Sequence, residues 1–213
     1  MLFRSVKREM FHVRLIYNSN FSKLGYKDQD VLELWKKFDS VSVGASLDAS
    51  GSRGEYIRKG QDWQETVENR QRMLEICPQV DFYISATVSI FNALHVADFH
   101  KEWIDLGLIK PQDININILQ SPDWYRIDVL PAELKDKVRK KITEHIQWLE
   151  PQDKLTRATS GYKGLISFMD AEDKSQQYLQ DFFTKTRALD NLRNENFYET
   201  FPELVEMKKY DIT

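Results

Sequence analysis

The sequence has one cysteine, no long apolar run and no excess of charge of one sign, and each absence excludes a class of protein. Cys77 alone cannot build a disulfide framework. No apolar stretch approaches the ~20 residues of a membrane span, and residues 1–12 are too charged to form the apolar part of a signal peptide. We therefore expect a cytoplasmic protein with no membrane partner.

The charges nearly cancel, with 30 basic and 33 acidic side chains and a net charge of −3. Such a balance gives no electrostatic reason to bind a nucleic-acid backbone, so no nucleic-acid partner is expected. The basic run Lys137 to Lys141 is best explained as the solvated face of a helix. With 41% hydrophobic residues, the 213-residue chain can bury the core of one large domain, or of a domain with a helical appendage.

Strand-like and helix-like segments alternate over the first 120 residues. The expected strands are residues 12–18, 40–47, 81–89 and 114–119, which are rich in β-branched and aromatic residues. The expected helices are residues 1–11, a segment capped by Asp28 or Asp30 that includes Val31 to Phe38, residues 63–76, and residues 93–106. Three strand–helix–strand crossovers predict a parallel sheet.

After Pro131 only helical patterns remain. One amphipathic face consists of Leu134, Val138, Ile142, His145 and Leu149, and a second of Tyr178, Phe182, Phe183, Thr186 and Leu189. Residues 150–163, between these faces, contain Pro, Asp, Ser and Gly and are expected to form an exposed loop. Residues 51–60, with three glycines, are expected to form another.

Small polar clusters follow the four expected strands. They are Asn18-Ser19-Asn20, Ser46-Leu47-Asp48, Ser89 to Asn92, and Gln120-Ser121. In a parallel sheet or barrel the carboxyl ends of the strands share one rim, and ligands bind along it. The sequence therefore predicts one pocket built from residues about 100 positions apart.

The most informative segment is residues 44–70. Ser46 and Asp48 at a strand end can bind ribose hydroxyls or an ammonium group, and Arg58 can pair with a carboxylate through two hydrogen bonds. Alternatively, Asp48 and Ser50 form an Asx-type turn and Arg58 caps a carbonyl. The glycines do not form a nucleotide P-loop, because no Gly-Lys-Ser/Thr follows at the required spacing.

The order of these motifs resembles a known family. The residues that carry the resemblance are Ser46, Leu47, Asp48, Arg58, Trp63, Val67, Asn69 and Leu74. They are similar to the region after the fourth barrel strand of radical SAM enzymes, most of all the branch with the molybdenum-cofactor and peptide-maturase enzymes. Where the family has Ser-hydrophobic-Asp-Gly and then Ile-Arg-Gly, this chain has Ala49 for the first glycine and Lys59 before Gly60.

Other segments fit the same family. Residues 17–20 are similar to its Thr-Asn-Gly strand end, residues 81–92 to its fifth strand and residues 113–122 to its sixth, while residues 187–193 and 201–204 resemble the tail of a phage- and marine-type group. The resemblance implies an α/β fold with a partial (β/α) barrel of about four parallel strands over residues 1–130. Residues 131–213 would be a helical C-terminal extension packed on the same domain.

The resemblance also implies binding roles for six residues. Ser46, Asp48, Arg58 and Asn92 would face the cofactor S-adenosylmethionine, and Asn18 and Asn20 would face the substrate. The family's three-cysteine motif would lie before residue 12 and is missing. We therefore expect no iron–sulfur cluster in this chain and no one-electron cleavage of S-adenosylmethionine by the chain alone. No catalytic residue and no metal ligand is predicted.

Two main functions and one further reading are compatible with this pattern. The chain is either the C-terminal half of a radical SAM-like protein, inactive alone, or a non-enzymatic binding or interaction module on a remnant barrel scaffold; an unrelated small-molecule α/β enzyme is a third reading. The open barrel edge predicts self-association through that edge, or coverage of it by the N- and C-terminal helices. The substrate is not identified by the sequence.

Other polar residues give weaker signals. His95 and His100 are five positions apart, not the four that place two imidazoles on one helix face for a metal. The segment Asp123-Trp124-Tyr125 either lines a pocket or seals a barrel end. Glu195, Glu199 and Glu203 are expected to be solvated, because Pro202 interrupts a shared helix.

Overall fold

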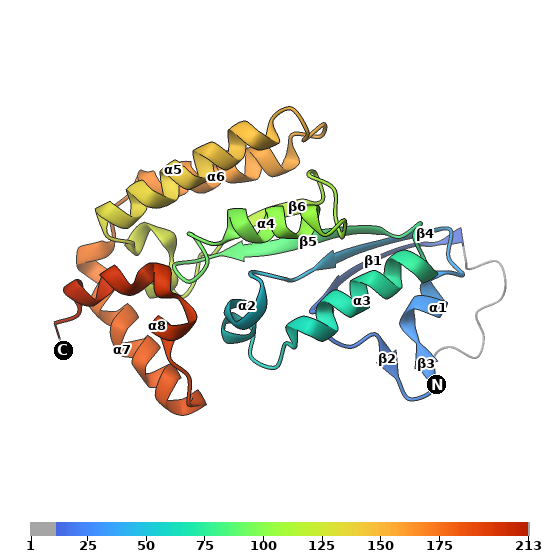
Figure 1. The fold of residues 1–213 in the computed structure, drawn as a ribbon, viewed down its shortest axis with the longest axis horizontal. Helices are drawn as coiled ribbons and strands as arrows, with labels where there is room; N and C mark the ends of the chain where they lie inside the picture. The colour runs from blue at the N-terminus through green and yellow to red at the C-terminus, as the bar shows by residue number, and fades with distance from the viewer. Residues whose placement is uncertain (1–11, 213) are drawn as a thin grey trace.

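The computed structural model describes residues 12–212 and shows a four-stranded sheet with helices around it (Figure 1). All three strand pairs are parallel, and the order across the sheet is β1-β4-β5-β6. A separate antiparallel pair, β2 and β3, follows β1. The expected mixed α/β fold with four parallel strands and C-terminal helices is confirmed.

The strands are β1 (Arg14–Ser19), β2 (Gly25–Tyr26), β3 (Gln29–Asp30), β4 (Ser40–Ala45), β5 (Asp81–Val88) and β6 (Ile114–Ile118). The α-helices are α1 (Val31–Trp35), α2 (Gly51–Ile57), α3 (Trp63–Ile76), α4 (Val96–Asp105), α5 (Ala132–Leu149), α6 (Arg157–Ala171), α7 (Ser175–Arg193) and α8 (Phe197–Thr200). The 3-10 helices within residues 14–212 are η2 (Asp123–Tyr125), η3 (Ile127–Val129) and η4 (Pro202–Tyr210).

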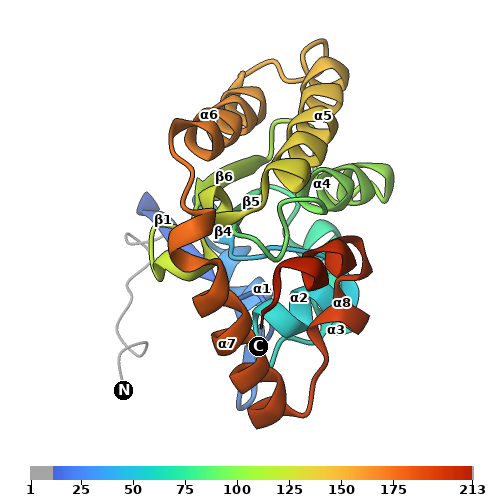
Figure 2. The ribbon, with the colours of Figure 1, turned by 90° about the vertical axis from the view of Figure 1, so that its left-hand side faces the viewer.

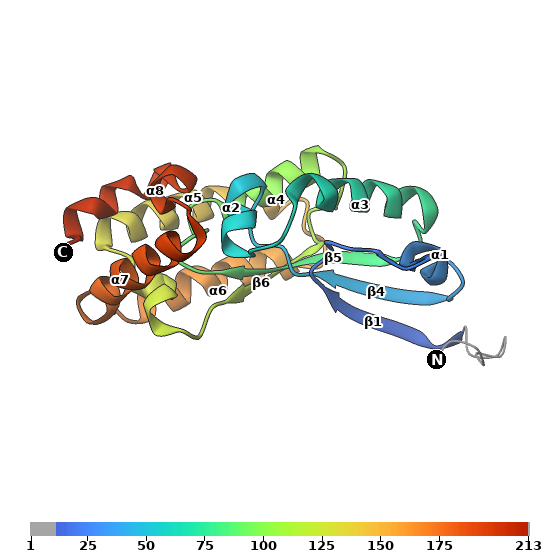
Figure 3. The ribbon, with the colours of Figure 1, turned by 90° about the horizontal axis from the view of Figure 1, so that it is seen from below.

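The two faces of the sheet differ in chemistry. In β5, Phe82, Ile84, Ala86 and Val88 are buried, whereas Tyr83, Ser85 and Thr87 are half-buried and Asp81 is exposed. The buried side meets α3 and α4, where the ring of Phe82 stacks on Trp103 with centroids 6.3 Å apart. Figure 3 shows α3 and α4 on one side of the sheet and β1 at its free edge. The core therefore lies between the sheet and these helices.

Local sequence signals explain where the helices begin and end. Asp30 caps α1 by accepting a hydrogen bond from the backbone of Leu32, and Asp62 caps α3 in the same way through Glu65. Gly107 adopts a positive φ of 70° just after α4, as expected for a C-cap. Cys77 is buried at the end of α3.

Two predicted loops are wrong. Residues 51–57 form α2, and α6 begins at Arg157, inside the segment predicted as an exposed loop. Gly161 explains the second error, because this glycine lets α6 pack against Ile116 of β6 and does not mark a turn. In α3, Arg70 and Met73 are buried, while Leu74 is exposed.

The helices α7 and α8 lie beyond the carboxyl ends of the strands, whereas α6 packs along β6 (Figures 1 and 2). Phe182, Phe197 and Phe201 surround Phe91, with ring centroids between 5.7 and 5.9 Å from it. This packing fixes α7 and α8 against the sheet.

The helix predicted for residues 1–11 lies outside the described residues. Among residues 12–212, no helix has both the length and the apolar composition needed to cross a bilayer.

Candidate ligand site at the carboxyl ends of the strands

Asp48 is the central polar residue of the rim. The residue is 3% exposed and follows β4, and its carboxylate accepts a hydrogen bond from the backbone N–H of Thr87 in β5 at 2.8 Å. Arg58 donates two hydrogen bonds to the same carboxylate, from Nε at 2.7 Å and from Nη2 at 3.2 Å. The carboxylate expected to pair with Arg58 is therefore Asp48 itself.

Asn92 links the same two strand ends, β4 and β5, through hydrogen bonds of its buried side chain. Its side chain is fully buried and donates from Nδ2 to the carbonyls of Asp48 at 2.8 Å and Thr87 at 3.0 Å. Its Oδ1 accepts from the backbone N–H of Ser89 at 2.8 Å. These three bonds position the loop that carries Asp48. Asn92 thus supports the rim, and its amide does not face solvent.

A pocket of about 280 Å³ opens beside Asp48. Its lining residues are Asp48, Tyr56, Ile57, Thr87, Ser89, Phe91, Leu119, Pro122, Tyr125, Leu189 and Arg193. They come from the ends of β4, β5 and β6, from α2 and from α7. Ligands in open parallel sheets bind outside the carboxyl ends of the strands, which is where this pocket lies.

The pocket combines groups of opposite charge with apolar walls. Arg193 donates from Nη1 to the carbonyl of Tyr56 at 3.0 Å, and the hydroxyl of Tyr56 donates to Asp190 at 2.8 Å. Burial, reinforced by Asp190, raises the pKa of Tyr56 well above its usual value. Burial also raises the pKa of Tyr125. Both phenols are therefore neutral at physiological pH, while Asp48 and Arg193 supply the charges.

The other predicted site residues lie elsewhere on the rim. The backbone N–H of Ser46 donates to the carbonyl of Ser19 at 2.8 Å, which places Ser46 between β1 and β4. Asn18 and Asn20 are exposed at the end of β1, and Asn18 lines a second groove. The structure thus brings Asp48, Arg58 and Asn92 together, with Ser46, Asn18 and Asn20 toward the sheet edge.

Sequence reasoning missed Tyr56 and Arg193 as pocket residues. Arg193 belongs to a tail segment that carried part of the family resemblance, but its position over the rim follows from the packing of α7. Tyr125 lies in the segment for which a pocket-lining role was one of two alternatives, and the structure confirms that it lines the pocket. Trp124 of the same segment is not among the lining residues.

A second polar cluster lies behind α2. The Ser50 hydroxyl lies 3.2 Å from Nε2 of His95 and also contacts the carboxylate of Glu102. Burial lowers the pKa of His95 to about 4, so this imidazole is neutral at pH 7. Ser50 is the N-cap of α2, and its side-chain bonds go to these two residues instead of to a turn.

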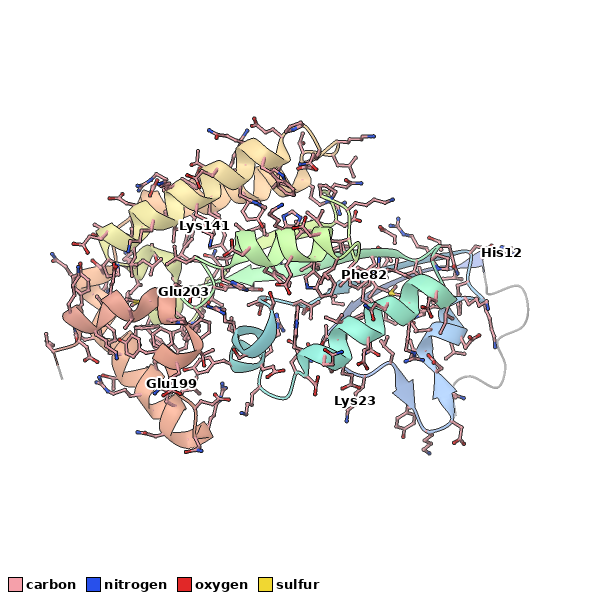
Figure 4. The ribbon with its side chains drawn as sticks, in the orientation of Figure 1. His12, Lys23, Phe82, Lys141, Glu199 and Glu203 are labelled. Carbon is pink, nitrogen blue, oxygen red and sulfur yellow. The ribbon has the colours of Figure 1, made fainter. Side chains whose placement is uncertain are left out.

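The prediction that Glu195 and Glu203 are solvated is wrong. Glu203, labelled in Figure 4, accepts two hydrogen bonds from Arg53 at 2.9 and 2.7 Å. Glu195 pairs with Lys59 at 2.5 Å, and its side chain is 18% exposed. Both carboxylates tie the C-terminal segment to α2 and the residues that follow it, which helps to hold α7 over the pocket.

No family model, curated protein or solved structure matches the chain.

Proposed function

We propose that the chain binds a small zwitterionic ligand at this rim, with S-adenosylmethionine as the candidate, in the manner of a radical SAM-like protein. One observation carries the proposal: the fold gathers Asp48, Arg193 and Tyr125, from distant parts of the sequence, into one pocket at the carboxyl ends of parallel strands. The motif resemblance of residues 46–58 agrees with that placement.

The chemistry of the lining suits such a ligand. Arg193 can pair with an α-carboxylate, and Asp48 can accept from an ammonium group or a ribose hydroxyl. Ile57, Phe91 and Leu189 supply apolar contact area. Ligand pockets usually enclose about 300–1,000 Å³, so a pocket of about 280 Å³ fits one half of S-adenosylmethionine, with the other half at its mouth.

The proposal includes a partial (β/α) barrel. The sheet face opposite α3 and α4 carries polar residues, as a barrel interior facing a substrate would. Ser42 donates to Asp81 at 2.9 Å, and Asn117 donates to Ser85 at 3.0 Å on this face. Gly44 lies between Asn18 and Tyr83, so that a Cβ there would be 2.9 Å from both side chains. Asn18 would then face a substrate from the barrel edge, and Asn20 would lie beside it.

The chain would bind this ligand without performing redox chemistry alone. A cluster that reduces S-adenosylmethionine needs several thiolates, and Cys77 is the single cysteine. We assign no catalytic residue.

Titration calorimetry with S-adenosylmethionine, methionine and adenosine tests the proposal. We expect Arg193→Gln to weaken S-adenosylmethionine binding about 10- to 100-fold, because a hydrogen bond to a charged group is worth about 1.5–3 kcal/mol. Arg58→Ala should weaken it too, by releasing the Asp48 carboxylate. Arg72→Gln is the matched control, since Arg72 pairs with Asp30 far from the rim.

Absence of binding to the wild-type protein, or equal affinity of the Arg193→Gln and Arg72→Gln variants, would refute the proposal. Arg58→Ala removes the partner of a buried carboxylate, which is destabilising. Its thermal unfolding must therefore be measured in parallel, and Arg193→Gln remains the decisive variant.

The alternative function, a non-enzymatic interaction module, is favoured by a different observation. An apolar groove of about 680 Å³ lies beside the edge strand β1, remote from Arg193. If none of the three small molecules binds, this groove becomes the main functional surface.

A further inference from the structure

The edge strand β1 exposes several large apolar side chains. The exposed large hydrophobic residues include Ile16 and Tyr17 of β1, Val13 just before it, and Tyr26 on the adjoining hairpin; Ile16 is 65% and Tyr26 71% exposed. Within residues 12–212, β1 pairs with β4 alone. Figure 3 shows β1 along the lower edge of the sheet and α7 and α8 beyond the strand ends at the left, so these C-terminal helices do not cover the edge of β1.

A groove runs along one face of this strand. Leu15 and Tyr17 form one wall, and Leu34, Trp35 and Phe38 contribute to the opposite wall. The ring of Tyr17 lies 5.6 Å from that of Trp35, centroid to centroid. Lys23, labelled in Figure 4, and Lys37 are the charged residues of the lining. A strand added to the edge would extend this apolar surface on one face of the sheet.

An added strand must match the alternation of β1. Its residues on the groove face must be apolar, next to Leu15 and Tyr17, and its residues on the other face must suit Arg14, Ile16 and Asn18. The sequence of β1 itself has this alternation. We propose that two copies of this chain pair antiparallel through β1, around a two-fold axis at Ile16.

The antiparallel register with its axis at Ile16 follows from the alternation of side chains in β1. With the axis at Ile16, the two Ile16 side chains are opposite each other, Leu15 is opposite Tyr17 of the second copy, and Arg14 is opposite Asn18. Each pair shares a face, as an antiparallel sheet with this symmetry requires, and no like charges are opposed. An axis at Tyr17 would instead place Ile16 opposite Asn18, so the first register is favoured.

Light scattering and sedimentation over a concentration series test the pairing. The wild-type chain should be a dimer at tens of micromolar, and Ile16→Lys should raise the dimer dissociation constant at least tenfold, because two like charges then face each other. Leu192→Lys is the matched control, since Leu192 is 84% exposed on α7. That variant should remain a dimer.

A cysteine pair tests the register. Residues opposite each other in an antiparallel pair have Cα atoms about 4.5–5.5 Å apart, within the range for a disulfide. Ile16→Cys should therefore cross-link to itself under mild oxidation, whereas Arg14→Cys, on the same face but far from the axis, should not. The native Cys77 is buried. A monomeric wild-type chain, or equal cross-linking of both variants, overturns the proposal. If the chain is monomeric, the groove must bind a molecule other than a second copy.

Discussion

At the residue scale, the most unusual pair is His100 and His145, where three helices meet. Nδ1 of His100 lies 3.0 Å from Nε2 of His145, and both side chains are buried. Tyr162 of α6 stacks on His100, with ring centroids 5.9 Å apart. The sequence placed His145 correctly on the buried face of α5, but nothing in it connected the two histidines.

This pair makes stability depend on pH. Burial, and for His100 also the neighbouring His145, lowers the pKa of His100 to about 3; burial lowers that of His145 to about 4. Both values are below the 6.5 of an unfolded histidine, so the unfolded state takes up more protons in acid. The stabilisation from keeping these rings neutral is complete above pH 6.5 and is lost as the pH falls toward 4.

We predict that the free energy of unfolding falls less between pH 8 and pH 5 in His145→Gln than in the wild type. At pH 5 each histidine held neutral costs about 2 kcal/mol, from 1.36 kcal/mol per pH unit below 6.5, and the variant removes one of them. Urea denaturation at the two pH values measures the difference. His12→Gln is the control, because His12 is exposed. The same pH dependence in all three proteins would contradict the assignment.

The site residues that sequence predicted best are those whose position depends on local structure. Asp48 and Arg58 follow β4 directly, so a strand end and a short segment suffice to place them near each other. Arg193 could not be found in this way, because its place over the rim depends on how α7 packs against Phe91, about 100 positions earlier in the chain.

At the scale of elements, α6 shows that a glycine, a residue type common in loops, can instead lie inside a helix and permit its close packing. Gly161 lies where a Cβ would be 2.9 Å from Cβ of Ile116, so only glycine allows α6 to approach β6 this closely. Gly164, one turn later, has no atom within 4 Å of such a Cβ. From sequence alone Gly161 is assigned to a loop over residues 150–163, since its packing partner is not visible there.

These two glycines should respond oppositely to alanine. Gly161→Ala should destabilise the protein by about 1–3 kcal/mol, as overpacking of a core contact does. Gly164→Ala should stabilise it by about 0.4–1 kcal/mol, because alanine restricts the unfolded chain and fits an exposed helical position. Chemical denaturation measures both. If Gly161→Ala were neutral, the close contact between α6 and β6 would not exist.

At the scale of the whole molecule, a cluster of aromatic rings joins the parallel sheet to the C-terminal helices. Tyr56 and Phe91, from the strand–helix region, meet Phe182, Phe197 and Phe201 with centroid separations between 5.2 and 6.5 Å. All five side chains are buried. The extension expected for residues 131–213 therefore shares its core with the sheet, although the sequence could not show which rings meet.

We predict that Phe91→Ala destabilises the whole molecule by about 3–5 kcal/mol, as expected for an aromatic residue removed from a core. Far-ultraviolet circular dichroism and tryptophan fluorescence should follow a single transition with the same midpoint, in the variant and the wild type. Leu192→Ala, at an exposed site of α7, should leave the midpoint unchanged. Two separate transitions would mean that sheet and helices unfold independently.

The strand order has a consequence for how the chain assembles. Each strand of the main sheet pairs with the strand of that sheet that precedes it in sequence, so the sheet can form by successive addition without waiting for the last third of the chain. The pocket cannot form in this way, because its lining includes Leu189 and Arg193 of α7, which must first pack against the sheet. A molecule that occupies the pocket would consequently recognise only chains that have completed their folding, and would hold them in that state.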